Sequence, residues 1–531
     1  MTVDEANLSA VDAAAADHQS FGANAVISAF SWFVPAAAAL VALPVTVRGL
    51  GADAYGLLAL VTALTGYLGL LEMGIAQAVV RYISYHRALG EGKTVVRIVL
   101  FALKWFVVVG VVGGLALFFS AGWLAHSVLH VPPQLWDSGV TVLRLAGLNF
   151  ALGMLVSVGL AVPQGFLRYD IAGGLNGLFG TVAAVGPAVI VMLGHGVVAV
   201  TAFFVVANLC AVAVYIVIVV RLLRRLPMRE ATPWPSVRRR ALRFAAVTAL
   251  TRIHTVVAAQ TNRLVVGVAE GTAAAAYYQI PNMLSTRTNE LLSRVAQVLF
   301  PTGAELLARE DDEGVRVLYL RSSRLFFLLN LSVTLAICVF ARPLLDYWID
   351  VAFAEAGTVA LAVFTVTQSL NAVTMAASFL NLSSERPGVN LGFSLANSII
   401  NLVTVYPLTV RYGISGAALA GLLGAATVPL FMQYTHARIL HIGSWLVLRS
   451  CYLPTVFGAG GVAALAYFLL RPLCNGLLVT LALWLVTVAL SFVAAGLAGA
   501  VKRDDLATAR RLTAAAWVRV ARRDRKSGNR G

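Results

Sequence analysis

Charged residues are scarce in this chain, and acidic residues are scarcer than basic ones. Of its 531 residues, 12% are charged and 59% are hydrophobic, and 24 Asp and Glu stand against 40 Lys and Arg. A soluble domain has about a quarter of its residues charged, so this composition indicates a membrane protein. No stretch of about 100 residues lacks a long apolar run, which excludes a soluble enzyme carried on a single membrane anchor.

Cysteines and catalytic motifs are also sparse. The four cysteines, Cys210, Cys338, Cys451 and Cys474, lie far apart without a CxxC pair, which argues against a disulfide framework or a metal site. The chain has no GxxxxGK(S/T) phosphate loop, and no His, Asp and Cys residues have metal-ligand spacing. We therefore expect no cofactor, no metal and no enzymatic activity. The basic excess points to the membrane rather than to nucleic acid.

Apolar runs of membrane-spanning length recur along the whole chain. A span takes ~20 apolar residues, and the runs predict an all-α polytopic membrane protein with about fourteen transmembrane helices. We expect them near residues 24–47, 56–80, 98–121, 140–164, 173–194, 197–220, 244–268, 273–300, 323–341, 356–380, 391–410, 415–437, 452–470 and 476–500. The first ~22 residues contain several acids and no basic segment, which argues against a cleaved signal peptide.

Basic residues are unevenly distributed between alternate connections, and this sets the expected orientation. An even number of spans places both termini on one side, which the positive-inside rule makes the cytoplasmic side of the membrane. Residues 1–22 are then a polar cytoplasmic N-terminus. The connection at 221–243 and the tail at 501–531 are the longest basic segments. We expect both to bind anionic lipid headgroups rather than a specific protein partner.

A weak parallel repeat divides the spans. Residues 48–56, RGLGADAYG, are echoed at 267–277, and Tyr55 and Tyr277 are 222 positions apart. This predicts two six-helix lobes in a pseudo-twofold arrangement, which is typical of transporters. The expected divisions are an N-lobe at 23–220, a C-lobe at 244–440 and two extra helices at 441–500.

Ionisable side chains deep in the spans are the best indicators of function, because a charge in the bilayer is expensive. Arg287 and Arg294 share a helical stripe with Glu290, and Arg252 and Thr255 lie on one face of the preceding span. We expect these two helices to line a cationic substrate cavity; the alternative is that Arg287, Glu290 and Arg294 neutralise one another. The remaining predicted site residues are Arg48, Asn262 and Arg263 for substrate binding, and Glu72 and Glu290 for ion coupling.

Uncharged polar stripes occupy two later spans. They predict hydrogen bonds between helices, and a sugar-contacting wall is the alternative. The residues are Thr367, Asn371, Thr374, Ser378 and Asn381 on one span, and Asn390, Ser394, Asn397, Asn401 and Thr404 on the next.

Several segments resemble bacterial oligosaccharide flippases, the Wzx-like polysaccharide transporter family of the multidrug/oligosaccharidyl-lipid/polysaccharide superfamily. Residues 43–60, LPVTVRGLGADAYGLLAL, and 70–82, LLEMGIAQAVVRY, are similar to the opening of these proteins. The segments NRLVVG at 262–267, YYQIP at 277–281 and VLFPTGAEL at 298–306 resemble their seventh and eighth helices. Asn262 stands where relatives often have an acid before the basic residue.

The resemblance implies that a glycan carried on undecaprenyl diphosphate is flipped from the cytoplasmic to the periplasmic leaflet by alternating access of the two lobes. Such a flippase would serve the synthesis of lipopolysaccharide or exopolysaccharide beside a polysaccharide polymerase or export machinery. The cationic stripe suits a diphosphate and would repel a cationic drug. The alternatives are, in order, a cation-coupled multidrug antiporter, a lipid II flippase and a non-transporting membrane scaffold.

Overall fold

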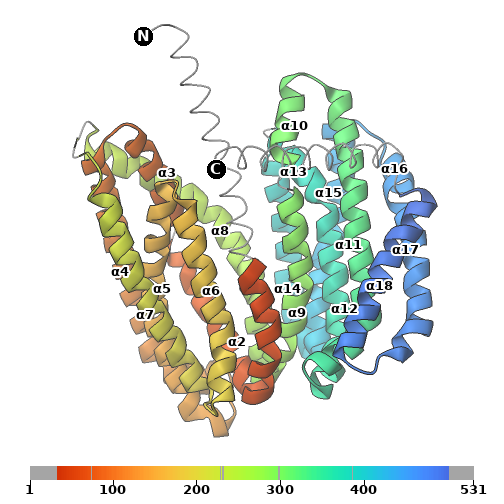
Figure 1. Ribbon diagram of the computed structural model, residues 1–531, viewed down its shortest axis with the longest axis horizontal. Coiled ribbons are helices and arrows are strands. Elements are labelled where there is room, and N and C mark those ends of the chain that lie inside the picture. Colours follow the sequence, from red (N-terminus) through yellow and green to blue (C-terminus); the bar gives the residue numbers. More distant parts are fainter. Residues whose placement is uncertain are drawn as a thin grey trace, which may run out of the picture. The chain divides into compact units, whose positions relative to one another are not determined.

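The computed structural model describes residues 33–72, 74–227, 229, 232–296, 299–384 and 387–500. This part of the chain is helical (Figure 1), and the prediction of an all-α polytopic membrane protein is confirmed. Eleven of its segments are long and apolar enough to cross a membrane. They are Phe33–Leu50, Ala52–Glu72, Gly92–Val128, Pro133–Gly165, Tyr169–Met192, Val197–Leu223, Asp312–Trp348, Val351–Leu382, Gly388–Leu440, Ser444–Leu473 and Leu477–Ala500.

Two of the predicted spans, 244–268 and 273–300, have no counterpart among these eleven segments. Both nevertheless lie in long helices, α8 (Trp234–Glu270) and α9 (Thr272–Ala296). Their arginines and other polar side chains lower the hydropathy of these helices below that of an ordinary span. The helices of low hydropathy, α8 and α9, are therefore the ones that contain most of the arginines expected deep in the membrane.

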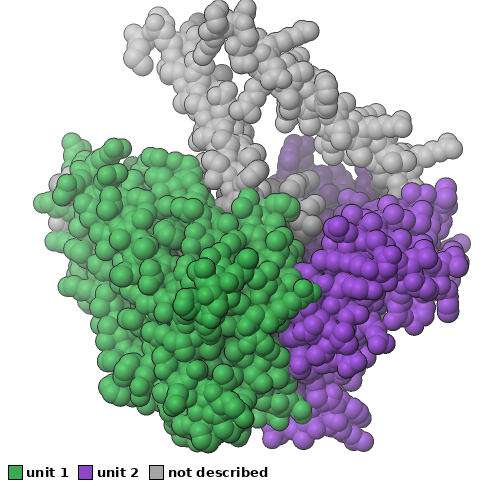
Figure 2. Space-filling view, turned by 60° about the horizontal axis from the view of Figure 1, so that its bottom comes forward, with its two compact units in different colours: residues 1–276 green, residues 277–531 purple. Residues whose placement is uncertain are grey.

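The chain forms two compact units, one up to Ala276 and one from Tyr277 (Figure 2). The boundary falls inside α9, so α8 belongs to the first unit. The two lobes inferred from the repeat, 23–220 and 244–440, stay a prediction.

Close contacts between backbones organise the first unit. On α4, a Cβ at Gly114 would lie 2.7 Å from the Gly147 carbonyl oxygen of α5, and one at Gly147 would lie 2.5 Å from the Gly114 oxygen. Small residues allow such an approach between helices that lie side by side in the membrane (Figure 1). The main helices of this unit are α2 (Ala52–Leu68), α3 (Ile75–Ala88), α4 (Gly92–Trp123), α5 (Trp136–Gly165), α6 (Tyr169–Met192), α7 (Val197–Leu223) and α8.

The helix predicted at 56–80 is broken, and the prediction of one continuous span there is corrected. Helix α2 ends at Leu68, a 3-10 turn follows at Gly69–Glu72, and Gly74 has a left-handed φ of 66° before α3 begins. Glycine takes this conformation without the penalty of a Cβ. Irregular backbone at membrane depth is tolerated where protein covers it.

The connection between α7 and α8 is fastened to the turn between α3 and α4. The backbone N–H of Gly92 donates to the Pro227 oxygen at 3.1 Å, and that of Lys93 donates to the Arg229 oxygen at 3.2 Å. The Thr232 hydroxyl donates to Glu91 Oε1 at 2.8 Å. These bonds, which we call the linker clamp, fix the chain directly before the first turn of α8.

Helix α11 (Asp312–Trp348) is the centre of the second unit. It packs against α12 (Val351–Val373), α17 (Leu453–Leu465) and α18 (Leu477–Ala495). Helices α17 and α18 correspond to the two predicted C-terminal spans, and a Cβ at Gly458 would lie 2.5 Å from the Cα of Ala495. The other helices of this unit are α10 (Leu299–Ala308), α13 (Met375–Ser383), α14 (Pro387–Gly424), α15 (Val428–Thr435) and α16 (Ser444–Val447).

One break interrupts a predicted span of the second unit, and one kink falls where a connection between two spans is predicted. The span predicted at 356–380 is divided at Thr374, between α12 and α13. The spans predicted at 391–410 and 415–437 meet at a kink within α14, where Gly413 has a φ of 59°. Glycine again permits the left-handed conformation that turns the chain.

Part of the predicted polar stripes joins helices in this unit. The Asn381 amide is fully buried and donates from Nδ2 to Asn390 Oδ1 at 3.0 Å, and Asn390 Nδ2 donates to the Ser378 carbonyl oxygen at 2.9 Å. Both bonds connect α13 with α14. For these residues the prediction of hydrogen bonds between helices is confirmed.

Candidate functional site

Helices α8 and α9 carry most of the residues predicted to bind substrate. Arg252, Thr255, Asn262 and Arg263 all lie in α8, and Arg287, Glu290 and Arg294 lie in α9. The side chains of Arg252, Thr255 and Arg294 lie outside the described residues. Their proposed contacts with substrate stay predictions.

Arg263 is buried against α2 in the first unit. Only 9% of it is exposed, and Nη1 donates to the Ala59 carbonyl oxygen at 3.2 Å. An arginine that bonds a backbone carbonyl at membrane depth holds two helices together. The structure thus gives Arg263 a packing contact, and its predicted part in substrate binding stays a prediction.

Asn262, the residue beside it, is also buried. Only 8% of its surface is exposed, and Oδ1 has no hydrogen-bond partner among the described residues. A buried amide oxygen without a partner costs free energy unless water, an ion or a ligand satisfies it. Asn262 is therefore compatible with a ligand contact.

Further polar contacts along the α2–α8 seam have no counterpart in the sequence predictions. The hydroxyl groups of Tyr67 and Thr261 form a hydrogen bond. Just beyond the end of α8, Thr272 at the start of α9 donates to Asp53 Oδ1 of α2 at 2.6 Å. A Cβ at Gly56 would lie 1.7 Å from the Thr272 carbonyl oxygen. The small and hydroxylated residues on one face of α2 are the signal that could have located this seam.

Arg287 forms an ion pair on α9 in the second unit. Its Nη1 donates to Glu290 Oε2 at 2.8 Å, and the side chains are 34% and 45% exposed. This pair is the one that the self-neutralising alternative requires. An exposed pair three residues apart contributes only about 0–1 kcal/mol, so a stronger anion can displace Glu290. On the same helix, Asn289 Nδ2 donates to Gln368 Oε1 of α12 at 2.9 Å.

Arg48 and Glu72, the two remaining predicted residues, lie in the first unit. Arg48 is exposed near the end of the segment Phe33–Leu50. Glu72 is 7% exposed and is the last residue of the 3-10 turn between α2 and α3. Broken helices often carry ion or substrate sites in transporters, so this position suits the predicted ion coupling, which stays a prediction.

The carboxylate of Glu91 belongs to the linker clamp, outside the membrane-spanning segments. Its burial raises the pKa of the carboxyl, but hydrogen bonds from Thr232 and from His86 Nδ1 at 2.7 Å outweigh this effect. The pKa of Glu91 therefore lies below its ordinary value of 4.5. Because the folded pKa is lowered, the stabilisation is present above that ordinary value and is lost as the pH falls through the folded pKa.

We expect Glu91→Gln to lower the melting temperature of the purified protein at neutral pH, since the amide cannot accept both charge-assisted bonds. The variant should also lose less stability than the natural protein when the pH falls below 4.5. Scanning fluorimetry over a pH series measures both effects. Glu313→Gln, on an exposed side chain in the first turn of α11, is the matched control and should change neither. Parallel pH curves for all three proteins would contradict the assignment.

Comparison with known proteins agrees with this fold. A protein of Shigella flexneri named "Putative O-antigen transporter" is 20% identical over 424 residues, which cover 79% of this chain and 98% of that protein. An inward-facing multidrug resistance MATE family transporter of the MOP superfamily has a TM-score of 0.66 at 15% identity and covers 78% of this chain and 98% of its own. The lipid II flippase MurJ, in an inward closed conformation, has a TM-score of 0.64 at 9% identity and covers 87% and 97%.

The two solved structures show that the fold is of the MATE and MurJ type, for which 12 to 14 transmembrane helices are expected. The family pattern described as "Polysaccharide biosynthesis protein" matches residues 45–349, which is more than half of the chain. It includes α8 and α9 as well as the broken second span. The protein is a multi-pass membrane protein that belongs to the polysaccharide biosynthesis protein family, a family of membrane transporters and not of enzymes.

Proposed function

We propose that the protein flips an oligosaccharide linked to undecaprenyl diphosphate from the cytoplasmic to the periplasmic leaflet of a bacterial inner membrane, with both termini in the cytoplasm. The family match over residues 45–349 carries this proposal. The name of the Shigella relative, which refers to O-antigen transport, supports the same class of substrate. In this proposal two lobes alternate in access, as is usual for transporters built from repeats.

The charge of α8 and α9 favours an anionic substrate. A diphosphate oxygen ~4 Å from an arginine gains on the order of 4 kcal/mol at an effective dielectric of 20. A diphosphate carries more negative charge than one carboxylate, and the pair between Arg287 and Glu290 is partly exposed, so the diphosphate can compete with the glutamate for this arginine. A cationic drug would have to pass the same arginines against repulsion.

Reconstitution into vesicles tests the proposal. We expect the purified protein to move a lipid-linked oligosaccharide across the bilayer, so that a glycosidase or lectin outside the vesicles gains access to glycan loaded inside. Lipid II and ethidium, offered in parallel, serve as substrates of the two alternative transporters. Transport of lipid II alone or of ethidium alone would overturn the proposal in favour of the corresponding alternative. Absence of any transport by a folded protein would favour the scaffold.

A further inference from the structure

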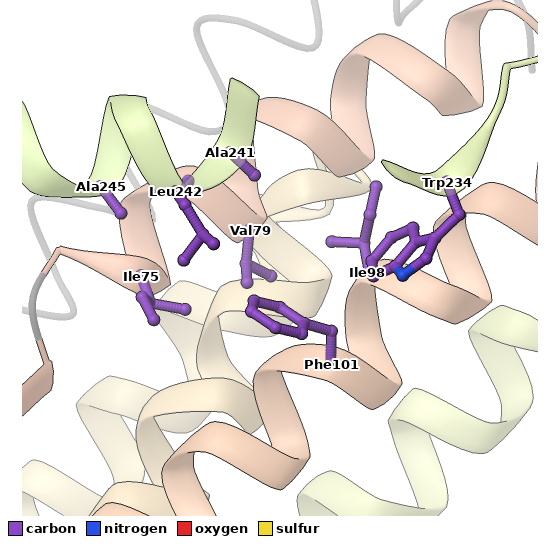
Figure 3. Close-up of a pocket in the computed structure, with 9 residues that line it drawn as sticks. Ile75, Val79, Ile98, Phe101, Trp234, Ala241, Leu242 and Ala245 are labelled. Atoms are coloured by element: carbon purple, nitrogen blue, oxygen red, sulfur yellow. The ribbon is translucent and has the colours of Figure 1, made fainter. Parts of the chain in front are cut away.

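A shallow apolar groove lies in the first unit where α8 crosses α3 and α4 (Figure 3). Its volume is about 310 Å³, including the space at its open side, and every side chain that lines it is apolar. In Figure 3 the side chains of α8 point toward those of α3 and α4. The lining residues are Ile75, Ala78 and Val79 of α3, Ile98 and Phe101 of α4, and Trp234, Ala241, Leu242 and Ala245 of α8.

The form of the groove suits a hydrocarbon chain. Its lining residues on α8 extend from Trp234 to Ala245, over about three helical turns or ~16 Å, which is close to the depth of one leaflet of the hydrocarbon core. It offers no hydrogen bond, so a sugar or another polar ligand gains nothing there. A shallow channel accepts one unbranched chain more easily than a polyprenyl chain, which carries a methyl branch on every unit.

Basic residues surround this groove. The segments 81–97 and 221–243, which flank it, contain twelve Lys and Arg and two Glu, and one of these, Glu91, is buried in the linker clamp. Arg238 is exposed one turn from both Trp234 and Leu242 on α8, and Arg97 is exposed one turn before Phe101 on α4. Cationic side chains therefore lie beside the Trp234 end of an apolar channel. This arrangement is complementary to a phosphate attached to a hydrocarbon chain.

We propose that this groove is a binding site for an anionic phospholipid of the leaflet on the basic side of the membrane. One acyl chain lies along the open side of the groove, over Phe101 and Leu242, and Arg238 and Arg97 bind the phosphate. Anionic lipids are preferred because a zwitterionic headgroup brings a cation toward the same arginines. The linker clamp holds Trp234 at the end of the groove, so the bound lipid fastens the first turns of α8 to the rest of the unit. This proposal does not depend on the transported substrate.

Native mass spectrometry of the purified full chain, titrated with dioleoylphosphatidylglycerol or dioleoylphosphatidylcholine, tests the site. We expect dioleoylphosphatidylglycerol to bind at least about fivefold more tightly than dioleoylphosphatidylcholine. This is the effect of roughly one arginine at a lipid surface. Arg238→Gln should remove most of this preference. Arg239→Gln makes the same change of charge on the neighbouring face of α8, where the side chain is also exposed, and should retain it.

Two further variants test the acyl-chain part of the site. Ala241→Phe fills the groove, and Leu242→Gln places an amide in it on a side chain that is already 39% exposed, so the second variant is the milder test of folding. Both should weaken binding of the two lipids by a similar factor. Ala116→Phe, on an exposed face of α4 remote from the groove, is the control and should bind as the natural protein does. Melting temperatures without added lipid establish that each variant is folded.

Three results would overturn the proposal. The first is equal affinity for the two phospholipids in the natural protein. The second is equal loss of binding in the groove variants and in the Ala116→Phe control. The third is displacement of phosphatidylglycerol by polyprenyl phosphate at lower concentration, which would assign the groove to the tail of a polyprenyl lipid. A failure of the flipping assay leaves these measurements unaffected, so the two proposals fail independently.

Discussion

Replacement of Arg287 or Arg252 by Ala abolishes glycan export in the proposed mechanism, while the protein still inserts into the membrane. A doubly charged diphosphate that crosses a region of low dielectric needs cationic partners that stay charged at every physiological pH. The loss of about 4 kcal/mol of attraction corresponds to a transport rate lower by about three orders of magnitude. Complementation of a strain that lacks its own flippase measures export, and membrane immunoblots measure insertion. Lysine at either position should retain part of the activity, since it keeps the charge.

Arg309→Ala is the matched control for Arg287→Ala. Arg309 lies just after α10 and pairs with Glu305 four residues earlier, so its removal breaks a similar exposed ion pair. We expect full complementation by this variant. The self-neutralising alternative makes a different prediction, namely that simultaneous apolar replacement of Arg287, Glu290 and Arg294 leaves export intact. Normal transport by that triple variant and by Arg252→Ala would remove the electrostatic argument for an anionic substrate.

Gly56→Leu should prevent the first unit from folding. The position at which a Cβ would be built lies 1.7 Å from the carbonyl oxygen of Thr272, the first residue of α9, so α2 and the start of α9 must separate before any side chain fits. Overpacking against a side chain costs about 1–3 kcal/mol or more, and a backbone carbonyl cannot move aside as a side chain can. The separation would also disturb the Asp53–Thr272 bond and the Arg263–Ala59 bond. We expect a strong loss of monodisperse protein in fluorescence-detected gel filtration.

Gly153→Leu provides the comparison for Gly56→Leu. Gly153 lies within α5, where a Cβ would meet no heavy atom within 4 Å, so the same substitution adds a side chain without a clash. This variant should elute as the natural protein does and melt at a similar temperature. Equal behaviour of the two variants would show that the close approach of α2 to the start of α9 is not required for folding.

Hydropathy predicted the membrane class and most spans, because long apolar helices such as α4, α7 and α18 have no other stable environment. It could not predict where a span breaks. The interruption between Leu68 and Ile75 depends on the left-handed backbone of Gly74, and a glycine in an apolar run has the same hydropathy whether its helix continues or turns. Hydropathy also does not reveal the break at Thr374, where the backbone stays right-handed, whereas the turn near Gly413 was marked by the polar residues around it.

The candidate site was predicted less completely than the fold. Helical periodicity correctly placed Arg287 and Glu290 within reach of each other, because positions three residues apart are neighbours on a helix. Periodicity does not reveal which neighbour a helix face meets. Arg263 was therefore predicted to bind substrate because of its charge. Its bond to the Ala59 carbonyl of α2 depends on packing between segments some 200 residues apart. The Tyr67–Thr261 contact was missed for the same reason.

The linker clamp also affects where the polypeptide can be divided into two co-expressed fragments that reassemble. A cut before Pro227 would leave the bonding groups of Pro227, Arg229 and Thr232 at the start of the second fragment and their partners, the α3–α4 turn, in the first. The second fragment would then begin with a short segment that binds the α3–α4 turn of the first fragment. A cut after Pro233 would instead leave both sides of the clamp in one fragment and deprive α8 of its tether. Reassembly of co-expressed halves should therefore be more efficient from the earlier cut.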